Sequence, residues 1–310
     1  MTDPDARTEA HAWIYAQLAI LGAGLTGPIE TIQDRPWSTV MRAPTDRGDL
    51  FFKASGTGLR HEPAVAAFLA RRRPDVVPSP LAVDRERGWM LMADAGSRLR
   101  ELVEEEHDVS RWLDVLPAYA WLQVDLAGAA SELLALGVPD MRLAVLPARY
   151  AALLDELDAT GAPADDEMGR LRDSIPRVSA MCAELAGFGI AETIQHDDLN
   201  DGAVYQRDGR YRILDWGDAC VSHPFFSMSV ALEGVIAWGP DDVEGSVDIA
   251  PYRNAYLAPF GGRRAADDLR AAFDLAVRLG WACRAVNGHV PGIDAGPTWA
   301  RLRMFLDGHP

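Results

Sequence analysis

Residues 195–218 read QHDDLNDGAVYQRDGRYRILDWGD, and this stretch decides most of what the sequence says about the fold. The segment Arg207–Arg210 has Asp-Gly at its centre, which is typical of a tight β-hairpin turn. The flanking strands place Asp198 before the hairpin and Asp215 after it. Because a hairpin folds back on itself, these two acids, 17 residues apart in sequence (215 − 198), can come close together in space.

Paired carboxylates of this kind suit phosphoryl transfer. One of them can orient an acceptor hydroxyl or take its proton, and the other can hold Mg²⁺ against the phosphates. An acid-rich loop before a hairpin also occurs as simple exposed turn chemistry. Here the order His-x-Asp, hairpin, apolar strand and Asp-Trp-Gly-Asp favours the catalytic interpretation.

Upstream of this stretch, residues 29–94 are predicted to form mostly strands with one helix. Residues 38–42 and 49–54 alternate as two strands around a polar turn. The helix is expected to begin at Pro63 and to end at a basic last turn followed by a proline. Residues 89–92 form a further apolar strand.

From residue 114 onward the pattern is helical. Apolar residues recur every three or four positions from Leu116 to Leu134, which predicts one long helix with a buried face. Further helices are predicted at 149–157, 167–185, 227–235 and 265–279, and residues 193–216 form a non-helical insert. A small strand-rich part therefore precedes a large helical part, with a break near residue 94.

The 195–218 stretch resembles the catalytic loop and metal-binding segment of the aminoglycoside phosphotransferase family, which is related to the protein kinases. The family pattern is His-Gly-Asp-Leu-His-x-Gly-Asn, a hairpin, and then Ile-Asp-Trp/Phe-Gly/Glu. The resemblance implies an α+β, protein-kinase-like, two-lobed fold. It also implies a nucleotide-binding N-terminal lobe at residues 1–93 and a mainly helical catalytic and substrate lobe at residues 94–310.

The same resemblance implies roles for individual residues. His196 matches the loop histidine, which is expected chiefly to brace the loop, and Asp198 matches the catalytic acid. Asp215 matches the metal-binding acid. Lys53 resembles the strand lysine that contacts the α- and β-phosphates of the nucleotide, and Glu62 matches the helix glutamate that steadies this lysine.

Two more segments fit the pattern, and Glu62 fits it with a qualification. The backbone of Met92, Ala93 and Asp94 resembles the hinge that binds the purine. Ser38 lies in the turn that would cover the phosphates, although this turn lacks a G-x-G-x-x-G run; backbone N–H groups with a Ser or Thr can do the same. Glu62 precedes a proline, which disfavours helical geometry and leaves open that it is an exposed acid at a helix start.

Besides the missing G-x-G-x-x-G run, two departures from the family pattern stand out. The metal-binding asparagine of the family falls at Ala203, which has no ligand atom. Either one metal ion is weakly held, or Asn200 or Asp201 substitutes, or catalysis is impaired. The segment His223–Phe226 resembles the family's Asp-Pro-x-x-Asp but lacks both acids.

The composition restricts the partners. Thirty basic and 46 acidic residues give a formal charge of −16, which disfavours nucleic acid and anionic membranes as partners. Three scattered cysteines argue against a disulfide framework. The polar, acidic start is unlike a signal peptide, and the most apolar stretch contains charged residues, so a cytoplasmic protein is expected.

The leading hypothesis is therefore an O-phosphotransferase that uses ATP or GTP with Mg²⁺ on a hydroxyl of a small molecule, such as an aminoglycoside or another amino or hydroxy compound. The alternative, favoured by Ala203, is a nucleotide-binding pseudokinase without turnover. A metal-dependent hydrolase built on His196 is disfavoured, because such sites need several more histidines at ligand spacing. Several acids of the helical part could line a site for a cationic acceptor, or equally form a solvated face: Asp218, Glu233, Asp241, Asp242 and Glu244.

Overall fold

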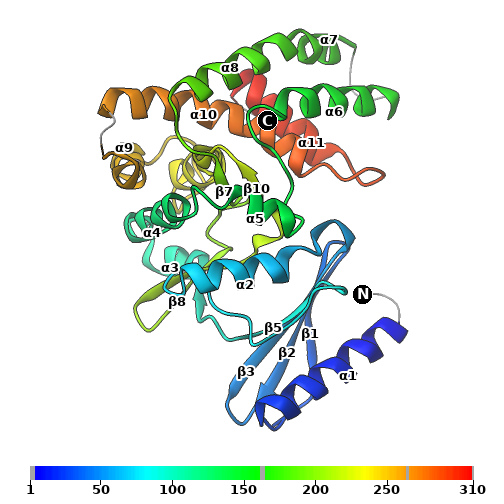
Figure 1. The fold of residues 1–310 in the computed structure, drawn as a ribbon. Coiled ribbons are helices and arrows are strands. Elements are labelled where there is room, and N and C mark those ends of the chain that lie inside the picture. The colour runs from blue at the N-terminus through cyan, green and yellow to red at the C-terminus, as the bar shows by residue number, and fades with distance from the viewer. Residues whose placement is uncertain (1–3, 161–164, 263–264, 309–310) are drawn as a thin grey trace. The chain divides into compact units, whose positions relative to one another are not determined.

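A computed structural model describes residues 4–160, 165–262 and 265–308 of the chain. The chain divides into two compact units, which are traced in Figure 1. Unit 1 comprises Met1–Leu99 and Gly202–Gly217, and unit 2 comprises Arg100–Asp201 and Asp218–Pro310. The hairpin that follows Asp198 therefore belongs with the N-terminal strands. A division of function at residue 93 stays a prediction.

Unit 1 is built on a five-stranded antiparallel sheet with the order β1-β2-β3-β5-β4. Its strands are β1 (Glu30–Arg35), β2 (Ser38–Thr45), β3 (Gly48–Ser55), β4 (Ala82–Asp84) and β5 (Trp89–Ala93). The predicted β2–β3 hairpin and the strand at 89–92 are confirmed. Lys53 lies on the central strand, paired with Val40 of β2 on one side and Met90 of β5 on the other.

The helix α1 (Pro4–Leu21) packs on one face of this sheet (Figure 1). Every fourth residue from Ala10 to Leu18 is buried against an apolar cluster that includes Phe52. Successive side chains of a strand point to opposite faces, so Phe52 faces α1 and Lys53 faces away from it. One face of the sheet is thus the apolar core with α1, and Lys53 lies on the opposite face.

Unit 1 is completed by α2 (Glu62–Arg72), a short 3₁₀ turn (Thr57–Leu59), and three more strands: β6 (Ser97–Arg98), β8 (Val204–Arg207) and β9 (Arg210–Ile213). β8 and β9 form the predicted hairpin, and both Asp208 and Gly209 have the positive φ that the turn requires. Gly96, with φ +95°, allows β6 to pair with β8, because a Cβ there would lie 2.2 Å from the carbonyl oxygen of Gln206.

Unit 2 is mainly helical. Its α-helices are α3 (Leu99–Glu106), α4 (Trp112–Asp125), α5 (Ala130–Ala135), α6 (Leu146–Thr160), α7 (Asp165–Asp173), α8 (Ile175–Gly187), α9 (Ala250–Leu257), α10 (Ala266–Asn287) and α11 (Gly296–Asp307). Two short antiparallel strands, β7 (Thr193–Gln195) and β10 (Cys220–Ser222), lie among them. Its single helical turns are η3 (Pro224–Ser227), η5 (Ile236–Trp238) and η6 (Ala258–Phe260), and η4 (Ser229–Val235) is a π-helix. A further turn, η2 (Trp216–Asp218), begins in unit 1 and ends at the first residue of the second segment of unit 2.

Three helix predictions are wrong in detail. The long helix predicted from 116 to 134 is interrupted between α4 and α5, where Gly128 lies and helix formation is weakest. The helix predicted at 167–185 breaks at Ser174, just before Ile175-Pro176, because proline has no N–H for the helical ladder. The helix predicted at 227–235 is split between η3 and the π-helix η4.

The π-helix is held against α10 by close packing. Ser229 donates a hydrogen bond to the carbonyl oxygen of Val277, and a Cβ at Gly280 would lie 2.1 Å from the hydroxyl oxygen of Ser229. Gly280 is thus required by the close approach of the two segments. Among the described residues, no helix is long and apolar enough to cross a membrane.

Candidate functional site

Unit 1 brings together three of the predicted site residues. The Lys53 ammonium lies 2.6 Å from Oε1 of Glu62 and 2.8 Å from Oδ1 of Asp215. The other oxygen of Glu62 accepts a hydrogen bond of 2.6 Å from the hydroxyl of Ser55. Glu62 is fully buried and Lys53 nearly so, whereas half of the Asp215 side chain is exposed. The cation is therefore fixed between a buried and a solvent-facing carboxylate.

The proline after Glu62 does not prevent this ion pair. α2 begins at Glu62, so Pro63 occupies the first turn, where its missing N–H would have no helical partner. Gly217, which follows the Asp215 segment, leaves room for the glutamate: a Cβ there would lie 3.2 Å from Oε2 of Glu62. The objection raised by the sequence is thus resolved by the position of the proline at the helix start.

Burial alone would lower the pKa of Lys53, but the charges of Asp215 and Glu62 outweigh it and raise the pKa above its ordinary value. The amine therefore stays protonated. Lys53 is also the sole lysine of the chain; the other basic residues are arginines. An ammonium is a compact point charge, unlike the planar guanidinium. Position 53 is therefore the one place in the sequence with an ammonium side chain.

Asp215 is held in an uncommon backbone conformation. Its φ is +60°, in the left-handed region that non-glycine residues rarely adopt. Just upstream, the N–H of Leu214 donates to the carbonyl oxygen of Ala203, which ties the end of β9 to the start of β8. A strained residue with an ion-paired, half-exposed carboxylate is a feature of functional sites.

The other predicted nucleotide residues also lie in unit 1. Ser38 begins β2 directly after the β1–β2 turn, and Gly56 braces this turn by donating a 2.7 Å hydrogen bond to the Trp37 carbonyl oxygen. β4 pairs with β5 only as far as Leu91. Among the described residues, the β4 side of the following Met92–Ala93 segment therefore has no strand partner.

Unit 2 holds the candidate catalytic loop. Oδ1 of Asp198 accepts a hydrogen bond of 2.5 Å from Nη2 of Arg284, which projects from the last turn of α10. Burial alone would raise the pKa of Asp198, but the positive charge of Arg284, with smaller contributions from His196 and Asn200, brings it below the ordinary value. Asp198 is therefore an anion at neutral pH, as a proton acceptor must be.

Two other residues of the loop, His196 and Asp197, are buried and hydrogen-bonded within unit 2. His196 is fully buried; its N–H donates to the Tyr119 hydroxyl, and its Nδ1 accepts from the N–H of Asp198. These contacts are those of a residue that braces the loop. Asp197, also buried, accepts hydrogen bonds from Gln195 and from Asn287, one helical turn beyond Arg284.

The candidate metal ligands differ in how far they are engaged. The Asn200 side-chain amide donates to the carbonyl oxygen of Asp198, and the Asp201 carboxylate is paired with Arg100 at 2.6 Å. Ala203 is buried. Among the described residues, no three potential His, Cys, Asp or Glu ligands cluster. Mg²⁺ commonly binds through one or two carboxylates together with waters and substrate phosphates, so the hard oxygen of Asp215 fits this ion.

Unit 2 has two cavities that are lined in part by α10. One, of about 460 Å³, which we call the Trp281 cavity, is lined by side chains of both charge signs and two indoles, among them Glu233, Trp238, Glu244, Asp274, Arg278 and Trp281. Trp281 is three residues from Arg284 on α10, a rise of about 4.5 Å. Burial raises the pKa of Glu233, although a 2.8 Å hydrogen bond from the Trp281 indole and the charge of Arg278 oppose the rise.

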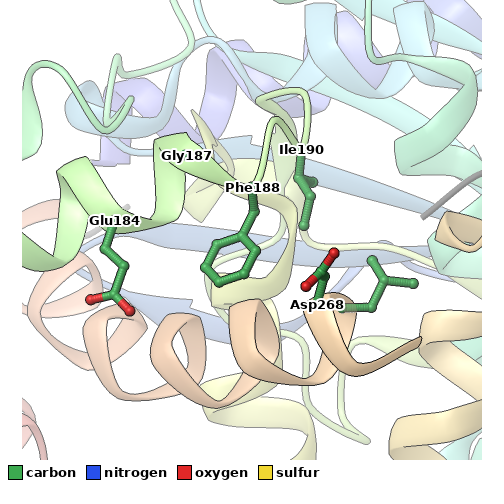
Figure 2. A pocket seen from close by; sticks show the side chains of 6 residues that line it. Glu184, Gly187, Phe188, Ile190 and Asp268 are labelled. Atoms are coloured by element: carbon green, nitrogen blue, oxygen red, sulfur yellow. The ribbon is translucent and has the colours of Figure 1, made fainter. Parts of the chain in front are cut away.

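The other cavity, of about 350 Å³, is shown in Figure 2. There Phe188 projects toward α10, and the carboxylates of Glu184 and Asp268 lie to either side of it. Asp268 is sixteen residues from Arg284 (284 − 268), which is about 24 Å along the helix axis. This cavity is therefore too far along α10 to serve Asp198.

Sequence reasoning missed Arg284 and Asn287, because 86 residues separate Arg284 from Asp198 and the helix pattern of α10 gives no hint of the contact. It also left His223 unexplained. Nδ1 of His223 accepts a hydrogen bond from the N–H of Phe225 and so caps η3. A neutral imidazole can thus supply the acceptor for which the family pattern has an aspartate.

Comparisons with known proteins give structural likeness only. No protein-family model matches the chain, and no curated protein matches it. A choline/ethanolamine kinase family protein from Mesorhizobium loti superposes with a TM-score of 0.56 at 20% identity, over 96% of this chain and 95% of that one. A macrolide 2′-phosphotransferase from Brachybacterium faecium has a TM-score of 0.55 at 17% identity, over 98% and 99%.

A third structure, the ternary complex of streptomycin, ATP and the phosphotransferase APH(2″)-IIa, has a TM-score of 0.60 at 13% identity, over 99% and 100% of the two chains. These likenesses span nearly the whole of each chain. The expected α+β architecture is confirmed: the chain has the kinase-like fold of the aminoglycoside and macrolide phosphotransferases and of the choline and ethanolamine kinases.

Proposed function

We propose that the chain is an O-phosphotransferase that moves the γ-phosphoryl group of ATP or GTP to a hydroxyl of a small molecule. The observation that carries the proposal is the Lys53–Glu62–Asp215 group: the chain keeps its sole lysine on a central strand, buried and paired to two carboxylates. Such an ammonium, oriented by a buried acid, is suited to the phosphates of a nucleotide.

In the proposed reaction, Lys53 holds nucleotide phosphates, and the backbone after Leu91 accepts the purine. Asp215 would hold Mg²⁺, which supplies charge neutralisation on the phosphates when it is bound. The acceptor hydroxyl oxygen bonds to the γ-phosphorus as the bond from that phosphorus to the β,γ-bridging oxygen breaks. Asp198 orients this hydroxyl and takes its proton, and the nucleoside diphosphate leaves. Positioning and charge account for most of the catalysis in such reactions.

The acceptor is proposed to enter the Trp281 cavity, whose volume is in the range of small-molecule sites. Its indoles and its excess of carboxylates, Glu233 above all, suit an acceptor that carries an amine as well as a hydroxyl. Glu233→Gln should raise the KM for such acceptors several-fold and leave the KM for the nucleotide unchanged. Glu184→Gln, at the cavity of Figure 2, is the matched control and should change neither.

A nucleotide carrying an acyl phosphate tests the nucleotide site directly, because it can acylate an amine that contacts its phosphates. We expect one labelled lysine, Lys53, with the label blocked by excess ATP or GTP and absent in Lys53→Arg. Choline, ethanolamine, streptomycin and a macrolide are then tested as acceptors with each nucleotide. If no lysine label is blocked by ATP or GTP, the proposed nucleotide site is wrong.

The same experiment separates the alternative function. Ala203, at the position of the family's asparagine, favours a nucleotide-binding pseudokinase. A protected Lys53 label without phosphate transfer to any acceptor or to water would support that alternative. Transfer to any acceptor would exclude it.

A further inference from the structure

The last turn of α10 holds the candidate catalytic loop from outside. Nη2 of Arg284 donates to the Asp198 carboxylate, and Nη1 donates to the carbonyl oxygen of Asp197 and lies 4.0 Å from its carboxylate. Three residues further on, Asn287 donates to the Asp197 carboxylate at 3.1 Å and to the carbonyl oxygen of Asp218 at 2.8 Å. One helix turn thus contacts both sides of the 202–217 insertion.

The loop's own residues do less to fix the Asp198 side chain. His196 bonds to the backbone N–H of Asp198, and Asn200 bonds to its backbone carbonyl oxygen and has only a small effect on the carboxylate. Arg284, which comes from another element, binds the carboxylate itself at 2.5 Å. Because the guanidinium is planar and presents donors in a fixed fork, one side chain can bind the carboxylate and the preceding carbonyl together.

The surroundings make this contact persistent. The Arg284 side chain is 13% exposed, and a cation this far out of water is costly without a counter-ion. The charges that act on it are Asp198, Asp197 and Asp218, and a second guanidinium, Arg301 of α11, donates weakly to the Arg284 carbonyl oxygen at 3.5 Å. Repulsion between the two guanidinium groups favours the position of Arg284 beside the carboxylates of Asp197 and Asp198.

From this geometry we propose that Arg284 is the positioning residue of the reaction: it fixes the Asp198 carboxylate in the orientation from which the acceptor hydroxyl is bound and deprotonated. The expected loss of rate rests on the proposed function. The contact of Arg284 with Asp197 and Asp198, which we call the clamp, does not. A base displaced by about 1 Å can cost on the order of 10²-fold in rate, whereas the nucleotide is bound by other residues.

The kinetic test uses the full chain with the acceptor that turns over fastest among choline, ethanolamine, streptomycin and a macrolide, or with water as acceptor if none does. Arg284→Ala should lower kcat about 10²-fold. The KM for ATP should stay within about three-fold of the parental value. Added guanidinium chloride at millimolar concentration should restore part of kcat. Arg284→Lys should remain impaired, because an ammonium cannot bind both oxygens in one plane.

Arg270→Ala is the matched control: Arg270 lies on the same helix but is exposed and paired with Asp267 only at its surface. It should keep the parental kcat and show no response to guanidinium. A second readout does not depend on activity. Hydrogen exchange of the amides in 195–201 should accelerate in Arg284→Ala and not in Arg270→Ala, because the loop loses its external support.

The outcomes distinguish the two ideas. Faster exchange together with a rescued kcat supports the proposal. Unchanged exchange, or a kcat that neither falls nor responds to guanidinium, overturns it even if the protein is an active kinase. Faster exchange in Arg284→Ala with no phosphate transfer by the parent, even to water, leaves the clamp established, and it is then the proposed function that fails.

Discussion

Replacing Lys53 by methionine should destabilise unit 1 more than replacing its partner Glu62 by glutamine. The reason is the asymmetry of their surroundings. Without Lys53, the fully buried Glu62 carboxylate keeps only the Ser55 hydroxyl of its two close partners. Without the Glu62 charge, Lys53 keeps Asp215 at 2.8 Å, and the glutamine oxygen can still accept its hydrogen bond.

These surroundings set the magnitudes. Stranding one member of a buried ion pair typically costs about 3–5 kcal/mol, which is our expectation for Lys53→Met. For Glu62→Gln, a weakened buried hydrogen bond costs about 1–3 kcal/mol. The double variant Lys53→Met/Glu62→Leu buries no charge and should recover most of the loss, because apolar replacements of buried ion pairs are often neutral.

The assay is equilibrium urea unfolding, with hydrogen exchange of the β3 amides as a local probe of unit 1, since two units need not unfold together. The parent, the two single variants and the double variant are compared under the same conditions. Equal losses for the two single variants, or a double variant as unstable as Lys53→Met, would refute this account of the ion pair.

Three further predictions follow from other parts of the chain. Burial lowers the pKa of His223 to about 3 from 6.5, so its contribution to stability is full above pH 6.5 and falls at lower pH, where the unfolded state takes up the proton. Between pH 7 and pH 5 this residue should lower the free energy of unfolding by about 2 kcal/mol. In urea titrations, His223→Asn should remove this pH dependence, and the exposed control His107→Asn should leave it intact. Gly280→Ala forces a Cβ to within 2.1 Å of the Ser229 hydroxyl and should cost about 1–3 kcal/mol in thermal unfolding, partly regained with Ser229→Ala; no loss would contradict the packing of η4 on α10. Ala203→Asn should lower the Mg²⁺ concentration for half-maximal turnover by restoring a ligand oxygen, and coincident Mg²⁺ titrations of parent and variant would remove Ala203 from the account of the metal.

Local chemistry made much of unit 1 predictable. The Asp208-Gly209 turn and the 45–48 turn each fix a hairpin within a few residues, and strand alternation puts Lys53 on the face opposite the α1 core. The lysine's pairing with Glu62 was also expected, through the family pattern rather than through spacing. These features depend on neighbours in sequence, which a single chain displays.

The helical unit was less predictable. The breaks at Gly128 and before Pro176 are local signals that the apolar period obscured, and the π-helix at Ser229 exists because α10 packs against it at Gly280. The grip of Arg284 on Asp198 spans 86 residues and carries no local signature. The convergence of Asp198 and Asp215 on one substrate pair stays a prediction.

The central claim is that this chain transfers phosphate to a hydroxyl through Asp198. The most direct test follows the ³¹P NMR spectrum of ATP or GTP with Mg²⁺ and each acceptor, for the parent and for Asp198→Ala. We predict a new phosphate monoester signal with the parent and its loss, by about 10²–10⁴ in rate, in the variant, while the acyl-phosphate label on Lys53 stays equally protected by nucleotide. A monoester formed at the same rate by both proteins would contradict the account.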